Sequence, residues 1–309
     1  MAAGDSILRA DSTRASSLSR AAGATRDLLS LILRTKTGRI GLAIITVHLF
    51  LAVAGPWITP FPPTEYHLSD RFSEPNGQYW LGTDDKGRDI LSRVVAGARS
   101  IIWISVTGTI FGIVLGTTVG VISGYVGGKV DQVMMRIVDW LLAIPSLLLA
   151  ILVINMATQR FGNSIDHSVI IIAIIGISFM PNNSRVIRSA VIAVKPLEFV
   201  QSARLRGEPP LYIMFREVLP NVLPVVAVEA TIRLSFALLL TAGLGFLGLG
   251  VQEPTPDWGL MVSENATNMG VVPLAALAPG LAMASLVVGI NLLSDGIRQA
   301  QNLPETDRA

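Results

Sequence analysis

The sequence predicts an all-α polytopic membrane protein with six transmembrane helices. Two observations carry this prediction, the amino-acid composition and the hydropathy pattern. Hydrophobic residues make up 51% of the 309 residues and charged residues only 15%, whereas about 25% of a soluble globular chain is charged. The mean hydropathy is +0.57. Windows of about 19 residues find apolar stretches long enough to cross a bilayer as helices. They cover residues 39–58, 100–125, 134–156, 168–192, 222–249 and 274–293.

These spans predict a membrane domain over residues 34–300, with tails at residues 1–33 and 301–309. The N-terminal tail and the region from Arg185 to Arg216 are rich in Lys and Arg, whereas the connection 250–273 holds neither. Cytoplasmic connections carry the excess of positive charge in membrane proteins. We therefore expect both tails and the connection 194–221 to be cytoplasmic, and the connections 60–98 and 250–273 to be external.

The two connections that we expect to be external differ in character. Thr83 can cap a helix with an apolar side that includes Ile90, Val94 and Ala98 and a polar side that includes Arg88 and Arg93. Such a helix would lie flat at the outer surface. The connection 250–273 is acidic, and its prolines prevent a regular helix.

The second span carries a glycine at every fourth position, namely Gly108, Gly112, Gly116, Gly120 and Gly124. Small residues let helix backbones approach closely in a membrane, and a four-residue repeat winds slowly around the helix. We interpret this strip as a surface that packs on another helix, in this chain or in a partner. A strip that lines a substrate path is the alternative.

Two pairs of opposite charges lie inside apolar spans. Arg136 and Asp139 are three residues apart, and Glu229 and Arg233 are four apart. Both spacings place the two charges on one helix face. Charges within a bilayer are costly and usually face protein or water. Each pair is therefore either a structural ion pair or part of a translocation path.

Residues 198–221 form a charged segment between two apolar spans. Pro196 suits the first turn of a helix and Gly207 suits the left-handed position after its end, so we predict a helix over residues 196–206. Pro209 and Pro210 cannot continue that helix. A second helix should begin there and run toward Leu219-Pro220.

Several classes of function are excluded by the residues present. A net charge of +2, without a basic stripe that contains aromatic residues, gives no reason to expect nucleic acid as a partner. The chain has no cysteine, which excludes disulfides and thiolate chemistry. Its three histidines lie in separate segments, so we expect neither a metal site nor a catalytic centre. The glycines at 243, 245 and 248 follow no strand, and we therefore expect no nucleotide site.

The charged segment and three other stretches resemble one transporter family. The pattern Glu198-x-x-Gln201-Ser202-Ala203-x-x-x-Gly207, followed by Leu219-Pro220-Asn221, is similar to the EAA loop of permeases in bacterial binding-protein-dependent ABC importers. LGTDDKGRDILSR, GYVGGKVDQVMMRIVDWLLAIPSLLLA and FLGLGVQEPTPDWG resemble the C-type permease of the dipeptide, oligopeptide and nickel branch. The chain departs from the family at Gln201-Ser202, where Glu-Ala is usual, and at Glu217, where many relatives have His.

The resemblance implies a type I ABC importer permease in a bacterial inner membrane. It implies that the chain binds no cofactor and catalyses no reaction, because ATP and Mg²⁺ are held by one or two separate ABC ATPase subunits. A homologous B-type permease and an external solute-binding protein are the other implied partners, besides membrane lipid. The implied docking residues for the solute-binding protein are Asp84, Asp85, Arg88, Asp89, Glu253 and Asp257; alternatively, these residues only shape the outer rim. The implied coupling residues are Glu198, Gln201, Ser202, Ala203, Arg206, Gly207, Leu219 and Pro220.

The implied cargo is a short peptide, moved into the cytoplasm by alternating access. Nickel chelates and glutathione are the alternatives within the family. An ion-gradient-driven secondary transporter is the alternative from another class. It would use Asp139 or Glu229 as a proton site and should contain an internal repeat, which we do not find in the sequence.

Overall fold

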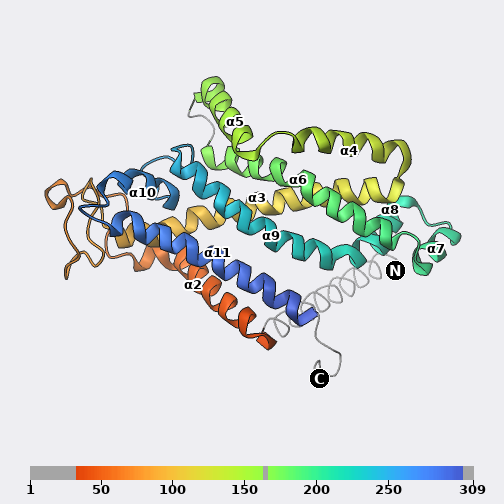
Figure 1. Ribbon diagram of the computed structural model, residues 1–309, viewed down its shortest axis with the longest axis horizontal. Coiled ribbons are helices and arrows are strands. Elements are labelled where there is room, and N and C mark those ends of the chain that lie inside the picture. The colour runs from red at the N-terminus through yellow and green to blue at the C-terminus, as the bar shows by residue number, and fades with distance from the viewer. Residues whose placement is uncertain (1–32, 163–165, 302–309) are drawn as a thin grey trace, which may run out of the picture. The chain divides into compact units, whose positions relative to one another are not determined.

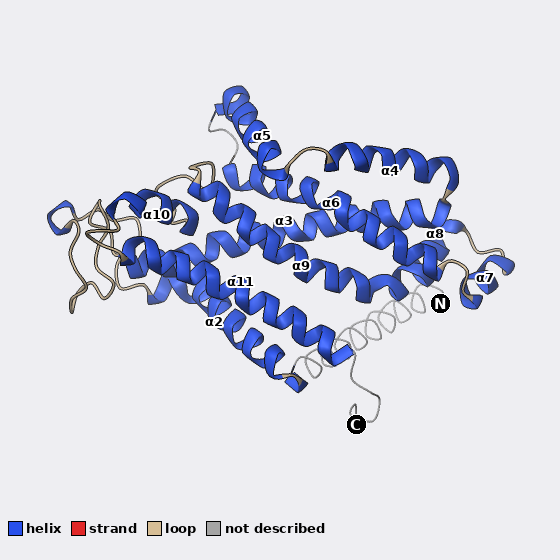
Figure 2. Cartoon of the chain, viewed as in Figure 1, coloured by secondary structure: helices blue, strands red, loops and turns tan. Residues whose placement is uncertain are grey.

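The computed structural model describes residues 33–162 and 166–301, and within them it is built from helices and their connections (Figure 2). The predicted tails therefore lie almost wholly outside the described residues. The chain divides into two compact units, Thr46–Val287 and the pair of segments Met1–Ile45 and Val288–Ala309.

The smaller unit contains the first part of α2 (Lys36–Ile58) and the last part of α11 (Leu274–Gln301). The backbones of these two helices nearly touch. A Cβ atom built on Gly41 would lie 2.5 Å from the Leu293 nitrogen, and one on Gly296 would lie 2.5 Å from the Gly38 Cα. Because this packing leaves no room for side chains, glycine is required at both positions.

The larger unit is organised around α3 (Ile90–Val126), α6 (His167–Val194) and α9 (Leu219–Phe246), which run side by side in Figure 1. Two buried apolar clusters join these helices. The first contains Ile104, Ile175 and Leu244, and the second contains Val121 and Val222. The short helices α7 (Glu198–Leu205) and α8 (Pro210–Tyr212) lie at one end of this unit, and α10 (Trp258–Asn265) lies at the other.

The third predicted span is not one continuous helix. It consists of α4 (Gly128–Leu142) and α5 (Ser146–Phe161), which meet at a bend of 82°. Pro145 at this bend cannot donate a backbone hydrogen bond. Five single helices of the described residues are long and apolar enough to cross a membrane, and this bent pair makes a sixth candidate. The number of spans thus agrees with the prediction, but the shape of the third does not.

The fifth span begins earlier than predicted, because the helix that starts at Pro210 does not end at Leu219-Pro220. It passes through a π-helical segment, Ile213–Val218, directly into α9. Pro220 lacks a backbone N–H and cannot make the usual helical hydrogen bond. The wider hydrogen-bond spacing of the π-helical segment lets the helix continue past this missing bond. The charged segment is therefore joined rigidly to a membrane-spanning helix.

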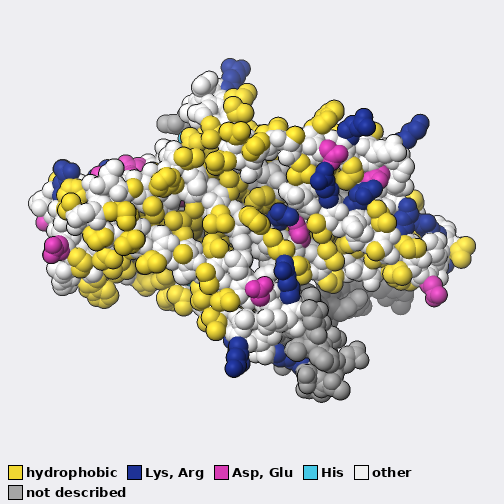
Figure 3. All heavy atoms as spheres, viewed as in Figure 1, with side chains coloured by type: hydrophobic (Ala, Val, Ile, Leu, Met, Phe, Trp, Pro, Cys, Tyr) yellow, Lys and Arg dark blue, Asp and Glu magenta, His cyan; other side chains and the backbone are white. Residues whose placement is uncertain are grey.

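The surface of the larger unit fits a lipid environment. Hydrophobic side chains cover broad areas of the face in Figure 3, and Lys and Arg gather toward the end that carries α7. Large apolar side chains are exposed on the flanks, among them Trp103, Trp140, Leu152 and Phe236. In a soluble protein such patches would cause association, whereas in a bilayer they face lipid or another membrane subunit.

Candidate functional site

The charged segment forms a short helix that ends in a sharp, fully bonded turn. α7 covers Glu198–Leu205, shorter than the predicted 196–206. Gly207 adopts φ +80°, as predicted. Its N–H donates to the Arg204 carbonyl at 2.9 Å, and the Glu208 N–H donates to the Ala203 carbonyl at 3.2 Å. These two bonds form a Schellman motif, which requires a left-handed residue at this position.

One side of α7 is held by the membrane domain, and the other side is free. Val200 and Ala203 are fully buried in the same apolar cluster as Ile213 and Val218. The Arg204 guanidinium lies 5.1 Å from the centre of the Tyr125 ring at the end of α3, which favours cation–π attraction. α7 is thereby fixed against α3 and against the π-helical segment Ile213–Val218, which continues into α9, so that a force on α7 would reach α3 and α9.

The free side of the segment offers a mixed surface. Most of the candidate coupling residues are exposed, namely Glu198, Gln201, Ser202, Arg206 and Gly207. Sequence reasoning missed the apolar part of this surface: Leu205 is 89% exposed and Leu211 is 65% exposed. Arg206 Nη2 lies 3.6 Å from Glu217 Oε1. Exposed leucines beside charged residues are typical of a protein-docking surface.

The glycine strip of α3 lies against α6. A Cβ atom on Gly116 would lie 2.7 Å from the Met180 carbonyl oxygen, and one on Gly120 would lie 2.7 Å from that of Ser184. The other members of the strip are also buried against α6, namely Gly108, Gly112 and Gly124. Asn183 of α6 donates to the Ile113 carbonyl at 3.0 Å. The structure thus places the strip at a helix contact within the chain.

Of the two predicted ion pairs, one forms and one does not. Arg233 Nε donates to Glu229 Oε1 at 2.7 Å, as the four-residue spacing predicts. Asp139 instead pairs with Arg185 of α6, so its predicted pairing with Arg136 is wrong. The reason is tertiary: α4 lies along α6, and the cation of the neighbouring helix reaches Asp139.

Arg88 is the centre of an ion network at the end of the larger unit opposite α7. Its side chain is only 1% exposed. Its guanidinium donates to Asp84 at 2.6 Å, to Glu253 at 2.6 Å and to Glu264 at 3.0 Å. Lys86 donates to Glu253 at 2.5 Å. A buried charge is tolerated only when it is paired and hydrogen-bonded in this way, and the network thereby ties the connections 60–98 and 250–273 together.

The network shows that the predicted interfacial helix is wrong. α3 begins at Ile90, with Asp89 accepting a hydrogen bond from the Ser92 N–H at 2.8 Å, and continues without a break to Val126. Thr83 is not the cap, since its hydroxyl oxygen accepts from the Ser73 N–H. No residue between Ala98 and Ser100 breaks the helix, so it runs on into the span. Arg88, just before this helix, is bonded to carboxylates, and the buried Arg93 lies 3.7 Å from Asp84 and 3.6 Å from Glu264.

Burial also corrects several candidate docking residues. Asp84, Arg88, Asp89 and Asp257 are all buried, and buried side chains cannot contact an external protein directly. Among the six candidates, Asp85 and Glu253 keep partly exposed side chains. The sequence alone does not show whether a polar side chain before a span faces solvent or a buried cation.

The two glutamates of the network have opposite pKa shifts. A hydrogen bond from the carboxyl of Glu264, together with those from Lys86 and Arg88, lowers the pKa of Glu253 to about 2. Burial raises the pKa of Glu264 above its usual value. Glu253 therefore carries the negative charge that balances the cations, and Glu264 takes up a proton more readily.

Asp257 is the buried N-cap of α10. Its Oδ1 accepts from the Leu260 N–H at 2.9 Å, and a Cβ atom on Gly245 would lie 2.1 Å from the same oxygen. A Cβ atom on Gly259 would lie 2.2 Å from the Ala242 carbonyl oxygen. α10 therefore lies directly on α9. Gly245, which the sequence analysis considered only as part of a nucleotide-binding pattern and rejected, thus has a role in packing these helices.

Burial raises the pKa of Asp257 from 3.8 to about 6, which predicts a pH-dependent stability. A carboxyl with a raised pKa in the folded state stabilises below its unfolded pKa, and this contribution is lost as the pH rises through its folded pKa. Asp257→Asn keeps a capping oxygen but cannot ionise. We expect wild-type stability to fall relative to this variant between pH 4 and pH 6, by about 1.4 kcal/mol per unit of pKa shift.

The measurement is thermal unfolding of the purified protein across this pH range. Asp257→Ala is the control, because it removes the cap as well as the charge and should be less stable than Asp257→Asn by about 1 kcal/mol at every pH. An unchanged difference between wild type and Asp257→Asn across the range would contradict the raised pKa.

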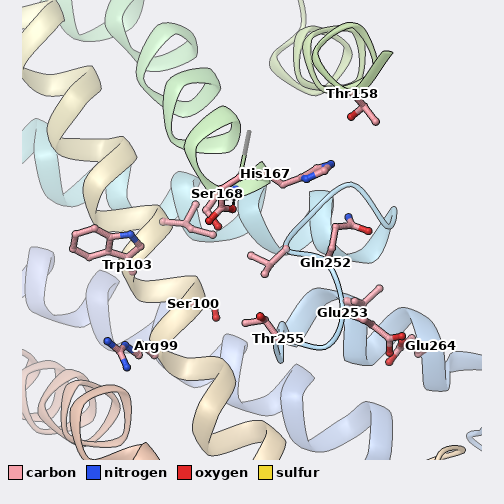
Figure 4. A pocket seen from close by; sticks show the side chains of 14 residues that line it. Arg99, Ser100, Trp103, Thr158, His167, Ser168, Gln252, Glu253, Thr255 and Glu264 are labelled. Carbon is pink, nitrogen blue, oxygen red and sulfur yellow. Dashed lines mark hydrogen bonds between the residues drawn. The ribbon is translucent and has the colours of Figure 1, made fainter. Parts of the chain in front are cut away.

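A cavity of about 1240 Å³ opens beside the ion network (Figure 4). Side chains from α3, from the start of α6 and from the connection before α10 line it. Figure 4 shows Arg99 and Trp103 on one wall, His167 on another, and Glu253 and Glu264 on a third. The cavity thus presents charges of both signs and an aromatic surface.

Two family models match the chain. The model described as the binding-protein-dependent transport system inner membrane component matches residues 116–302, and that of the N-terminal TM domain of oligopeptide transport permease C matches residues 25–75. The first of these covers the helices α4 to α11 and the connection that holds α7.

Known proteins resemble the chain over most of its length. The dipeptide transport system permease protein DppC of Alkalihalophilus pseudofirmus is 37% identical over 279 residues, which cover 89% of this chain and 88% of that protein. The glutathione transport system permease protein GsiD of Pectobacterium atrosepticum is 36% identical over 257 residues, covering 82% of this chain and 83% of that protein.

The fold is also found in a solved transporter. An inward-facing structure of the MetNI methionine ABC transporter superposes with a TM-score of 0.57 at 21% identity, covering 68% of this chain and 97% of that chain. At this identity the likeness concerns the fold alone. With the two sequence matches, it leads to one conclusion: the chain belongs to the family of inner-membrane components of binding-protein-dependent transport systems, the permease subunits of ABC importers.

Proposed function

We propose that this permease moves short peptides into the cytoplasm as the C-type subunit of its importer. The observation that carries the proposal is the exposed docking surface of α7, which is fixed to membrane-spanning helices and has no other evident use. Dipeptide permeases are among the proteins that it resembles at 37% identity. The outer cavity, with charges of both signs, suits a zwitterionic peptide better than an apolar solute.

In this proposal α7 transmits the movement of an ATPase subunit to the membrane domain. Leu205 and Leu211 would enter a groove of the ATPase, and the Schellman turn at Gly207 would set the angle of α7. Closure of the ATPases on ATP and Mg²⁺ would then move α9 and α3 together, because α7 packs on both, and would switch the path between inward-facing and outward-facing states. ATP is held by the partner subunits.

The complete importer would contain a homologous B-type permease, one or two ABC ATPases and an external solute-binding protein. The substrate path would lie between the two permeases. The outer cavity would receive the substrate released by the binding protein, with Glu253 and Thr255 at its exposed rim. Asp85 would contribute to the same docking surface.

This arrangement requires both termini and α7 to be cytoplasmic in a bacterial inner membrane. Cysteines introduced at the exposed Ser69 or Thr255 are expected to react with an impermeant thiol reagent in intact cells, whereas one at Ser202 is expected to react only after lysis. The natural chain contains no cysteine, so each variant reports a single site. Labelling of Ser202→Cys from outside would reverse the proposed orientation.

The proposed function is tested by isolating the importer and identifying its cargo. The chain should purify with a second permease and with ATPases, and the ATPase activity should rise when the loaded binding protein is added. Mass spectrometry of ligand bound to that binding protein should find short peptides. A nickel chelate or glutathione would assign the other cargo of the family, and purification without an ATPase would contradict the coupling proposal.

A further inference from the structure

The break between α4 and α5 leaves backbone donors unpaired within an apolar span. α5 has 16 residues, and its N-cap, Pro145, supplies no side-chain cap. Among the described residues, the N–H groups of Ser146, Leu147 and Leu148 have no hydrogen-bond acceptor. Unsatisfied backbone groups are tolerated at membrane depth only where they are buried in protein or line a water-filled cavity.

The start of α5 does line a cavity. A space of about 240 Å³ lies between the α4–α5 break, α6 and α9. This volume holds roughly eight water molecules, enough for one end of a short peptide. Ser146, Ser178, Asn182 and Arg233 supply polar groups to its wall. The hydroxyl of Ser178 is enclosed and has no hydrogen-bond partner in the described part of the chain.

Arg233 supplies the positive charge of this cavity. Its Nε donates to Glu229 Oε1 at 2.7 Å, and its Nη2 donates to the same oxygen. Its Nη1 makes no hydrogen bond to the described residues and remains for a ligand. Glu229 is 7% exposed, so it fixes the guanidinium from behind without entering the space in front.

The cavity wall therefore offers the unpaired N–H of Ser146, the guanidinium of Arg233 and the hydroxyls of Ser146 and Ser178, beside the Asn182 amide. A carboxylate only accepts hydrogen bonds, and arginine matches its geometry. The dipole of α5 adds positive potential at its N-terminus. We propose that this cavity binds the terminal carboxylate of the peptide during translocation. The inference rests on the proposed function, since it assigns the chemistry of a step within it.

The test measures the sign of the potential in the cavity. Ser146→Cys is introduced into this otherwise cysteine-free chain, and the complete complex in lipid nanodiscs is treated with anionic and cationic methanethiosulfonate reagents of similar size. Rates are normalised to a free thiol. We expect the anionic reagent to be favoured about tenfold by the nearby positive charge. Thr158→Cys, on the same helix but in the outer cavity, should show no such preference.

Matched arginine variants locate the source of this potential. Arg233→Gln should remove the anionic preference at Ser146→Cys. Arg185→Gln also removes an ion-paired arginine, but one that lies outside the cavity wall, and it should leave the preference unchanged. A preference near that of the free thiol, or one that Arg233→Gln does not alter, would overturn the site.

The ligand is tested with dialanine and its C-terminal amide. Millimolar dialanine should slow the labelling of Ser146→Cys by the anionic reagent, and the amide at equal concentration should not. Equal protection by both, or protection by neither, would overturn the carboxylate assignment. Peptide uptake by the wild-type complex is measured separately: its absence would count against the proposed function, whereas uptake without charge preference at Ser146→Cys would count against this site alone.

Discussion

Gly116→Leu is expected to prevent assembly of the importer. A Cβ atom at this position would already lie 2.6 Å from the Asn183 amide nitrogen and 2.7 Å from the Met180 carbonyl oxygen. Overpacking typically costs about 1–3 kcal/mol, and the cost should be at the upper end here because one obstacle is the backbone of α6. The separation of α3 and α6 would also break the bond from Asn183 to Ile113. The measurement is the yield of monodisperse complex by size-exclusion chromatography.

Gly243→Leu is the matched control for this prediction. Gly243 also lies within a long apolar helix, but a Cβ atom there meets nothing within 4 Å. The same change of residue should therefore leave the yield of the chain far less affected. Normal yield and transport in Gly116→Leu would mean that α3 and α6 are not in contact along the glycine strip.

The spans could be predicted from the sequence because they depend on local composition. A run of about 20 apolar residues must form a helix in a bilayer whatever its neighbours are. The close packing of the second span on another helix could likewise be predicted, since a glycine at every fourth position marks one side of a helix. Its partner was not, because any helix could have supplied the facing surface.

The pairing of charges could not be predicted, because it depends on tertiary structure. Asp139 was assigned to Arg136 by helical spacing, but the packing of α4 on α6 brings Arg185 to it. In the same way Arg88 was expected to face solvent, although Asp84, four residues away, and the distant Glu253 and Glu264 enclose it. A charged side chain near a span can find its partner on any neighbouring helix or connection. Sequence spacing reveals only the possible partners on its own helix.

The candidate coupling site was predicted more accurately than the outer face for a physical reason. Its turn depends on Gly207, Pro209 and Pro210, whose backbone preferences act locally. The outer connections contain few such residues between Asp89 and Ser100, and nothing local distinguished a separate surface helix from the first turns of α3. α3 begins at Ile90 because nothing interrupts the helix before the span and because the ion network around Arg88 holds its first turn.

Gly207→Val is expected to lower stimulated ATP hydrolysis and transport together without preventing assembly. Gly207 has φ +80°, and a Cβ atom there meets nothing within 4 Å. Space is therefore not limiting, and the strain arises only from the left-handed backbone, which costs about 1–2 kcal/mol for an L-residue with a Cβ. The chain can relieve this strain by opening the Schellman turn, which would tilt α7 away from its ATPase while the membrane helices stay packed.

Asparagine provides the control, because it tolerates the left-handed region better than other residues with a side chain. Gly207→Asn should retain most activity, and Gln201→Glu, which restores the usual family residue, should be tolerated. The measurement is ATPase activity of the purified complex with and without loaded binding protein, together with peptide uptake into proteoliposomes. Gly207→Val should express near normally and lose stimulation and uptake together. If it keeps both, α7 is not the element through which the ATPases move α9, and the mechanical part of the proposal fails even though the family assignment stands.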